Sequence, residues 1–584
     1  MCGIAGIFKF NSVPVEKSQL KKMTDVISHR GPDGEGHWIN ASAMVGFGHR
    51  RLSIIDLSNN GSQPMHYLNN RYTITFNGEI YNYLELKQTL LSKGYQFVSD
   101  SDTEVLLAMY DWKKENCLMY LDGMFAFAIW DEKEQELFCA RDRFGEKPFH
   151  YYLDKNEFVF GSEIKQFWAY GIEKKIVQSR MLQFLESGQI DDPFETDQTF
   201  YHQIKRLDPA HFMLFRRNGI PFIKKYWDID LEATFQGTME EATDQFYSIF
   251  KESVSLRLRA DVSVGTSLSG GLDSSSICMI INLLKADGQK QTSFSARFKN
   301  FEKDEGIYIE EVLRACKNVE ANFVWPDENY FFENFTKINY HQDEPYTSTS
   351  MIAQYSVMEL AKTKGITVLI DGQGADECLG GYMPYYKLYL DSLFYTDKQK
   401  FEKEKLAYDS LHSDTRPYEA PDKNETFRMK LGRFKKTLLR QNMPYGPDAL
   451  KEKLYADTSS MHLQTLLRYA DRNSMANSRE VRLPFLSHRL IEFIFTLPDH
   501  FKLNSGWTKY ILRKAMDPVL PRQICWRTNK VGYESPQEKW LQHPAILSEI
   551  ISAKEQAQGL LETARLESNS NINPWRALIA KQYL

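Results

Sequence analysis

A strand, a glycine turn and a helix in direct succession constrain the fold of this chain more than any other feature. Residues 262–269 form a short apolar run with strand character, and residues 274–284 follow as an apolar helix. The turn between them, residues 269–275, reads Ser-Gly-Gly-Leu-Asp-Ser-Ser. Residues 292–298 and 367–370 predict further short strands, with helical stretches between them. Strands that alternate with helices in this way predict a parallel α/β sheet.

The amino-terminal part has a different pattern, which predicts a separate fold. Short β-branched or aromatic runs, bounded by Gly, Asn, Asp or Pro, predict strands at residues 44–49, 72–76, 125–130, 137–140 and 158–161. Helical stretches intervene at residues 18–27, 83–93 and 103–112. A polar stretch over residues 230–240 then separates this pattern from the next. We therefore expect an α+β domain (1–205), a connecting segment (206–240) and an α/β domain with a largely helical carboxyl-terminal part (241–584).

Composition excludes several classes of protein. A chain of 584 residues is too long for one hydrophobic core. The net charge of −5 gives no electrostatic reason to expect a nucleic acid or an anionic membrane as partner. Seven cysteines, without a C-x-x-C pair, predict neither a zinc site nor a disulfide framework and fit a reducing cytosol. We expect no signal peptide and no membrane span, and hence a cytoplasmic protein.

Cys2 is the first candidate for catalysis. Methionine is removed readily before a small residue, which would leave Cys2 with a free α-amino group. Such a group titrates near ~8, so that at neutral pH it can act as a base for the thiol of the same residue. A cysteine at position 2 could also be an accident of the chain start, so the neighbouring motifs have to decide.

Three further groups would let this thiol attack a side-chain amide. Asn77 and Gly78, placed just after a predicted strand, offer a side-chain amide and a backbone N–H as donors to an oxyanion. Arg51 can hold a carboxylate through two parallel hydrogen bonds. Asp102 can hold an α-ammonium group. These residue types together would suit attack of the thiol on a side-chain amide of a substrate that carries a carboxylate and an ammonium group.

The amino-terminal motifs resemble the class II glutaminase domain of asparagine synthetases. They are MCGIAGIF at the chain start, HRGPD (29–33), GHRRLSIIDL (48–57), GSQPM (61–65), FNGEIYN (76–82), SDTEVLL (101–107), LDGMFAFAIWD (121–131) and RDRFGEKP (141–148). The resemblance implies an N-terminal nucleophile sandwich in which Cys2 is the nucleophile and Asn77 and Gly78 form the oxyanion hole. It implies that glutamine is bound by Arg51, Glu79 and Asp102, and that RDRFGEKP is structural and faces the second domain.

The turn at residues 269–275 predicts a site for a polyphosphate. Two glycines allow close approach of the backbone, and serine hydroxyls and a helix N-terminus supply hydrogen-bond donors. A plain strand-to-helix turn is the alternative. The motif resembles the pyrophosphate loop of ATP pyrophosphatases, and a Walker A motif is absent from this turn. The resemblance implies that a carboxylate attacks the α-phosphate of ATP, and it assigns the ATP site to Ser269, Gly270, Gly271, Asp273, Ser274 and Ser275.

A second glycine-rich turn, residues 371–377, is similar to the loop that lines the ATP and acyl-adenylate site in the same family. By that resemblance Asp371, Gly372, Gln373 and Asp376 contact the nucleotide, and Asp273 and Asp376 hold Mg²⁺. Lys530 would neutralise phosphate charge, although Asn529 competes for this position. Leu268 and Ala296 would line the adenine pocket, where ordinary core packing explains them equally well.

Two departures from the family pattern leave the acceptor open. The family glutamate of the second loop is Gln373 here, and a neutral amide is a poor proton acceptor. The resemblance places Thr349 where the family has an arginine that grips aspartate, and Arg297 or a residue of the helical region could take the place of that arginine. The best reading is synthesis of asparagine from aspartate, glutamine and ATP. The alternatives are another carboxylate acceptor, such as a uronic acid of a surface glycan or a natural-product precursor, and a non-catalytic glutamine sensor. The resemblance also implies a possible homodimer.

Overall fold

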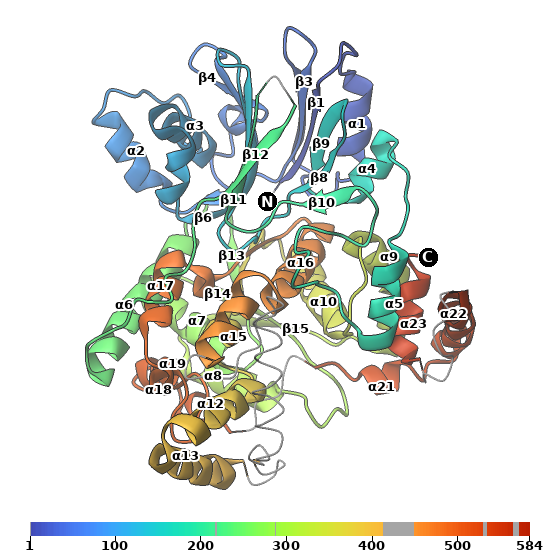
Figure 1. Cartoon of the computed structure of the whole chain (residues 1–584). Helices are drawn as coiled ribbons and strands as arrows, with labels where there is room; N and C mark the ends of the chain where they lie inside the picture. The colour runs from blue at the N-terminus through green and yellow to red at the C-terminus, as the bar shows by residue number, and fades with distance from the viewer. Residues whose placement is uncertain are drawn as a thin grey trace.

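The structure is a computed structural model that describes residues 2–216, 219–286, 288–412, 418, 449–528, 534–563 and 572–584. Figure 1 shows an amino-terminal β-sandwich above a parallel sheet that is surrounded by helices. Within the described ranges, no helix is both long enough and apolar enough to cross a membrane.

The sandwich consists of two antiparallel sheets. One sheet has the order β10-β8-β9-β1-β3-β2, and the other has the order β12-β11-β7-β6-β5-β4. The strands of the first sheet are β1 (Gly3–Lys9), β2 (Gly34–Ile39), β3 (Val45–Arg51), β8 (His150–Leu153), β9 (Glu157–Gly161) and β10 (Ile204–Arg206). Those of the second are β4 (Met65–Tyr67), β5 (Tyr72–Ile80), β6 (Gly123–Asp131), β7 (Glu136–Arg141), β11 (His211–Phe215) and β12 (Pro221–Lys225).

Helices cover both outer faces of this sandwich. Between the sheets, Phe8 and Phe47 pack against Trp130 and Leu137 in an apolar core. α1 contacts β1 and β3, whereas α3 contacts β5, so the layers follow the order helix, sheet, sheet, helix. The helices of this part are α1 (Lys17–Asp25), α2 (Tyr83–Leu91), α3 (Asp102–Lys113), α4 (Lys165–Tyr170) and α5 (Gln178–Ser187), with 3₁₀ turns η1 (Asn59–Gly61) and η2 (Lys114–Met119).

The carboxyl-terminal part is built on a parallel sheet with the order β15-β14-β13-β16-β17. Its strands are β13 (Val264–Ser267), β14 (Gln291–Ala296), β15 (Val319–Val324), β16 (Val368–Ile370) and β17 (Glu480–Arg482). The strand order reverses between β13 and β16, and ligands of open α/β sheets bind at such a reversal, outside the carboxyl ends of the strands. The two glycine-rich turns of the sequence follow these two strands.

Helices surround this sheet on both sides (Figure 1). They are α6 (Met239–Arg257), α7 (Leu272–Leu284), α8 (Gly306–Ala315), α9 (Glu328–Gln342), α10 (Ser350–Thr363), α11 (Ala375–Leu379), α12 (Met383–Thr396), α13 (Lys398–Leu411), α15 (Ala449–Ser459), α16 (His462–Ala476), α17 (His488–Thr496), α18 (Asp499–Lys502), α19 (Tyr510–Met516), α20 (Arg522–Cys525), α21 (Gln537–Trp540), α22 (Pro544–Thr563) and α23 (Pro574–Lys581), with the 3₁₀ turn η3 (Pro484–Leu486). The predicted fold class, an α+β sandwich followed by a parallel α/β sheet with a helical carboxyl-terminal part, is confirmed.

Candidate active sites

Cys2 lies at the start of β1, where the two halves of the chain meet. Its backbone N–H donates to Asn77 Oδ1 at 2.9 Å, and its Sγ lies 3.8 Å from the carbonyl oxygen of Leu52. The residue is only 8% exposed, and this burial raises the pKa of the Cys2 thiol. A thiol with a raised pKa is protonated at neutral pH, so it needs a base before it can act as a nucleophile.

Asn77 offers an unused hydrogen-bond donor next to Cys2. Its Oδ1 is occupied by the Cys2 N–H, whereas its Nδ2 is buried and has no hydrogen-bond partner in the described part of the chain. Buried polar groups are nearly always paired, so an unpaired amide beside a thiol suits a ligand oxygen. Asn77 and Gly78 lie inside β5, which extends to Ile80, and not after the strand as the sequence predicted.

Of the residues predicted to bind glutamine, Glu79 and Arg51 lie close enough to influence the Cys2 thiol, and Asp102 lies near Glu79. Glu79 is buried, and burial together with Glu480 and Asp102 raises its pKa well above the ordinary value. Asp102 accepts the backbone N–H of Ile80 at 2.9 Å, and burial raises the pKa of Asp102 to about 6. Arg51 donates to the carbonyl oxygens of Ser58, at 2.8 Å, and of Asp56. Charges on Glu79 and Arg51 both influence the Cys2 thiol.

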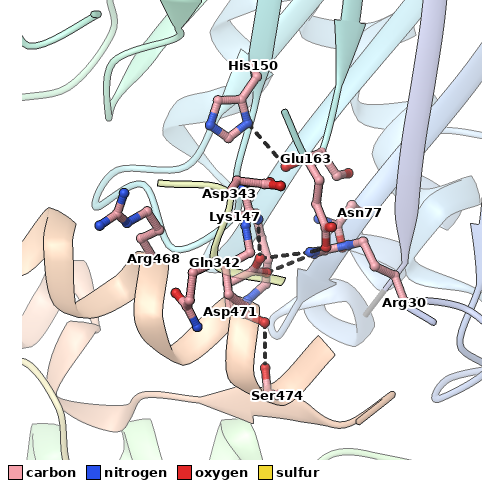
Figure 2. Close-up of polar contacts among 12 residues, drawn as sticks. Arg30, Asn77, Lys147, His150, Glu163, Gln342, Asp343, Arg468, Asp471 and Ser474 are labelled. Carbon is pink, nitrogen blue, oxygen red and sulfur yellow. Dashed lines mark hydrogen bonds and ion pairs between the residues drawn. The ribbon is translucent and has the colours of Figure 1, made fainter. Parts of the chain in front are cut away.

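Two arginines connect this region to the carboxyl-terminal part. Arg30 Nε donates to the carbonyl oxygen of Cys2 at 3.0 Å, and both terminal nitrogens of Arg30 reach the Asp471 carboxylate on α16 at 2.8 Å (Figure 2). Arg482 on β17 lies 3.7 Å from Glu79 Oε1. Residues of the second half therefore help to hold the region around Cys2.

Further buried ion pairs extend the Arg30–Asp471 contact across the boundary. Glu163 accepts a hydrogen bond from Arg30 at 2.8 Å and pairs with Lys165. Lys165 also pairs with Asp343 at 2.8 Å, and Arg472 lies between Asp343 and Asp471 at 3.3 and 2.8 Å. These groups are almost inaccessible to solvent, so each charged side chain is stabilised by its ion-pair partners in place of water.

A second candidate site is a pocket of about 370 Å³ at the carboxyl ends of β13 and β16. Both glycine-rich turns form its wall. The predicted residues that line it are Leu268, Ser269, Gly271, Asp273, Ser274, Asp371, Gly372, Gln373 and Asp376. Gly270, Ser275 and Ala296 are not among the described residues that line the pocket, although Phe294 and Ser295 of the same strand as Ala296 do line it.

The glycines bring the two turns close together. Gly270 has a φ of +79°, a conformation that favours glycine. At Gly372, an added Cβ would lie 3.1 Å from Asp273 Cβ and from the backbone nitrogen of Ser274. The backbone of the second turn at Gly372 therefore packs against Asp273 and Ser274 of the first turn, where the strand order of the sheet reverses. A larger residue at position 372 would push the two turns apart.

Lys509 joins the two acidic residues that were predicted to hold Mg²⁺. Its Nζ lies 2.6 Å from Asp273 Oδ2 and 2.8 Å from Asp376 Oδ1. Asp273 Oδ1 is buried and has no hydrogen-bond partner in the described residues. Carboxylate oxygens are the ligands that Mg²⁺ prefers, so this donor set fits the ion.

Comparison with known proteins decides the family. The glutamine amidotransferase domain profile matches residues 1–227, and the asparagine synthase profile matches residues 245–570. The chain belongs to the asparagine synthase family. Glutamine-hydrolyzing asparagine synthetase 1 of Bacillus subtilis is 32% identical over 93% of this chain and 88% of that protein, and asparagine synthetase 3 of the same organism is 32% identical over 100% and 96%.

More distant relatives of the family carry other names. Amidase chry2 of Gibberella zeae is 29% identical over 89% of this chain and 85% of that protein. Among solved structures, a glutamine phosphoribosylpyrophosphate amidotransferase from Bacillus subtilis covers 63% of this chain and 81% of that chain. It has 15% sequence identity and a TM-score of 0.29, a likeness too weak to carry an argument.

Some pocket residues of this family member were not predicted as site residues. Besides Lys509, they include Glu377, Tyr382, Arg513 and Arg527. Lys509, Arg513 and Arg527 lie more than 200 positions from residues 269–275 in the chain, and nothing local in the sequence places them in the same pocket. Lys530 and its competitor Asn529 lie outside the described residues.

Thr349 and Arg297, the residues discussed for binding of aspartate, both contact other side chains of the protein. The Thr349 hydroxyl lies 2.6 Å from the Ser535 hydroxyl, and the Thr349 N–H donates to Gln537 at 3.2 Å. Arg297 pairs with Asp304 at 2.8 Å and is not among the described residues that line the pocket. Arg297 is therefore not placed to replace the family arginine in this structure.

Proposed function

We propose that the chain is a glutamine-hydrolysing synthetase that makes asparagine from aspartate and ATP, with release of AMP and pyrophosphate. The observation that carries this proposal is the pocket at the sheet reversal, whose wall is formed by both glycine-rich turns. Relatives named glutamine-hydrolyzing asparagine synthetase align along nearly the whole chain. Their name supports aspartate as the acceptor.

At the amino-terminal site, Cys2 would attack the side-chain carbon of glutamine. Removal of Met1 would free the α-amino group, which would take the thiol proton. The Asn77 Nδ2 and the Gly78 N–H would stabilise the oxyanion, because the amide nitrogen of Asn77 has no other partner in the described residues. Arg51, Glu79 and Asp102 would hold the carboxylate and ammonium of the substrate. Ammonia would leave as the glutamyl thioester of Cys2 forms, and water would then hydrolyse this thioester to release glutamate and the free thiol.

At the second site, a carboxylate would attack the α-phosphate of ATP. Residues 269–275 would donate hydrogen bonds to the departing pyrophosphate, and α7 would present its N-terminus to it. Asp273 and Asp376 would hold Mg²⁺, whose charge would offset that of the phosphates. Lys509, held between the same carboxylates, and Lys530 would add positive charge. Ammonia would then displace AMP from the acyl-adenylate.

Other features of the proposal rest on the sequence alone. The domain limits 1–205, 206–240 and 241–584 stay predictions, as do a homodimer and a cytoplasmic location. Another carboxylate acceptor is the second candidate, and the contacts of Thr349 favour it, because no arginine stands at that position. A uronic acid or a natural-product precursor would then replace aspartate.

Release of AMP tests the acceptor directly. The enzyme should release AMP with aspartate, glutamine and ATP, and should form one amide for each AMP. A panel of uronic acids and other carboxylates at equal concentration provides the comparison. Release of AMP with another carboxylate and none with aspartate would overturn the asparagine assignment. If no carboxylate of the panel led to release of AMP, the synthetase proposal would be overturned.

A further inference from the structure

A nearly buried histidine at the boundary between the two halves has an unpaired ring nitrogen. His341 lies in the last turn of α9 and is only 8% exposed. Its Nδ1 is inaccessible to solvent and has no hydrogen-bond partner in the described residues. Buried polar groups are nearly always paired, so an unpaired imidazole nitrogen indicates that another group binds there.

Two further side chains with ligand atoms lie beside His341, and both come from the amino-terminal half. The rings of His29 and His341 pack edge to face, with their centroids 4.4 Å apart. His29 Nε2 lies 3.1 Å from Glu163 Oε1. One ligand atom from each of the three side chains lies within 4.8 Å of the other two. The boundary therefore brings two imidazoles and one carboxylate around a common point.

Contacts across the boundary hold these side chains in place. The Ser478 hydroxyl of the carboxyl-terminal half donates to the carbonyl oxygen of His29 at 2.7 Å. The residue after Glu163, Ile164, donates its N–H to Asp343 Oδ2 at 2.9 Å, directly beyond the end of α9. The segments that carry the three side chains are thus fixed to one another by other residues. A site whose ligands are held by their surroundings pays less to bind an ion.

The cations beside Glu163 do not depend on this carboxylate alone. Arg30 also makes two hydrogen bonds with Asp471, both at 2.8 Å (Figure 2). Lys165 also pairs with Asp343 at 2.8 Å. Both cations therefore keep an acidic partner when Glu163 turns Oε1 toward a metal ion. The negative charge of Glu163 then offsets part of the charge of that ion.

The ligand types select the ion. Mg²⁺ and Ca²⁺ prefer oxygen ligands, whereas two imidazoles and a carboxylate suit Zn²⁺. Ligands at about 2.1 Å from a tetrahedral zinc ion lie about 3.4 Å from one another, so the three side chains have to close in only slightly. The His29 side chain is 16% exposed and gives the ion a route from solvent.

We propose that His29, Glu163 and His341 bind one Zn²⁺ ion, which joins the amino-terminal sandwich to α9. The two histidines bind through neutral imidazole nitrogens and Glu163 through its carboxylate, and water completes the tetrahedron. The three ligands are not among the described residues that line the pocket at the sheet reversal. The ion is structural: it stabilises the boundary next to Arg30, whose Nε holds the carbonyl oxygen of Cys2. This role is independent of the proposed function.

The zinc content of the full chain tests the site. The protein is stripped with a chelator, incubated with two equivalents of Zn²⁺ in excess Mg²⁺, and desalted before the metal is measured. One zinc ion per chain should remain on the wild type. His29→Gln and His341→Gln should each lower the affinity by about 100-fold or more, because loss of a supporting residue alone costs about 10- to 100-fold. A wild type without zinc, or variants that keep it, overturns the proposal.

His202→Gln is the matched control. His202 is an exposed histidine outside the cluster, so this variant should retain one zinc ion like the wild type. If it loses the ion as His29→Gln does, the loss is not specific to the cluster and the proposal fails. His29 is the more exposed of the two histidine ligands, so His29→Gln decides the question if His341→Gln does not fold.

Cobalt(II) shows which ligands hold the ion. Co²⁺ can replace Zn²⁺ and absorbs visible light, and thiolate ligands add an intense band in the near ultraviolet. The wild type should show the visible bands without the thiolate band, although the chain has seven cysteines. His29→Gln should lose the visible bands. A thiolate band in the wild type would assign the ion to cysteines and overturn the proposal.

Zinc should also stabilise the folded chain. An ion that binds the folded state raises its resistance to denaturant by mass action. The urea midpoint of the wild type and of His202→Gln should rise when Zn²⁺ replaces the chelator, whereas that of His29→Gln should stay where it is. Hydrogen exchange of the wild type should slow in peptides that contain His29 or His341. Equal zinc dependence of the midpoint in wild type and His29→Gln overturns the proposal.

Discussion

In the proposed function, Asn77 serves both the fold and the reaction. Its Oδ1 holds the backbone of Cys2, while its Nδ2 stays unpartnered in the described residues. Loss of one oxyanion donor typically lowers turnover by about 100- to 1,000-fold. We expect Asn77→Ala to lower glutamine hydrolysis by that factor, measured as glutamate release. Amide formation from ammonium salts should be unchanged, and a parallel loss of both activities would contradict the two-site arrangement.

Glu146 is a buried acid at the boundary between the two halves, and it gives stability a pH dependence. Burial, and secondarily Asp142, raises the pKa of Glu146 from 4.5 to about 8. Between these values the folded state keeps a proton that the unfolded state has lost. The contribution of this retained proton to the free energy of unfolding is fully present below about pH 4.5 and is lost as the pH rises toward 8.

Glu146→Gln removes this titration while keeping the shape of the side chain. The free energy of unfolding of the variant minus that of the wild type should increase by about 1.4 kcal/mol for each pH unit between 5 and 8. Urea titrations at four pH values measure it. The exposed Glu252, which pairs with Arg489 at the surface, supplies the control variant Glu252→Gln. Equal pH dependence in both variants would contradict the raised pKa of Glu146.

At the scale of elements, local patterns were informative and long-range pairing was not. The strand predicted at residues 125–130 is β6, and the helix predicted at residues 274–284 is α7. β1 was missed because every residue from Gly3 to Lys9 is buried, so the strand has no alternation of polar and apolar side chains. β17 was missed because it has only three residues, two of them charged, and forms by pairing with β16.

α16 connects the two halves through Asp471. The carboxylate makes two hydrogen bonds with Arg30, whose side chain is fully buried. Asp471→Asn would leave the Arg30 charge with Glu163 as a single acidic partner among these residues. Removal of one partner from a buried pair costs about 3 kcal/mol or more. We expect that loss in the free energy of unfolding, measured in urea.

The exposed pair between Arg489 and Glu252 is again the comparison for Asp471→Asn. Both side chains of this pair are about half exposed, at 51% and 47%. Exposed pairs contribute about 0–1 kcal/mol. Glu252→Gln should therefore change the free energy of unfolding little. If Asp471→Asn is as mild as Glu252→Gln, α16 does not depend on Arg30 for its position.

For the whole molecule, the sequence predicted residues for each candidate site but not the contacts between the sites. The turns after β13 and β16 are local, and their glycines and hydroxyls could be read directly. Lys509 lies 236 residues from Asp273, and Arg30 lies 441 residues from Asp471. A charged residue at such a separation has no local signal that names its partner. Packing of the sandwich against the carboxyl-terminal part brings Arg30 to Asp471, and the fold of the carboxyl-terminal part itself brings Lys509 to Asp273.

One residue spans the distance between the two sites. The Arg482 side chain lies 3.7 Å from Glu79 beside Cys2, and its carbonyl oxygen accepts the N–H of Asp371 in the pocket turn at 3.0 Å. We expect ammonia released near Cys2 to reach the pocket inside the protein, because one residue contacts both regions. Synthesis from glutamine by the wild type should then resist an enzyme, such as glutamate dehydrogenase, that consumes ammonia in solution.

A mixture of two inactive variants tests this internal route. Cys2→Ala keeps the pocket but releases no ammonia, whereas Asp273→Ala hydrolyses glutamine but does not adenylate. In the mixture, ammonia has to cross from one molecule to another through solvent. We expect the mixture to form amide slowly and to lose it when the ammonia-consuming enzyme is added, while the wild type continues. Equal sensitivity of mixture and wild type would show that ammonia leaves the protein between the two sites.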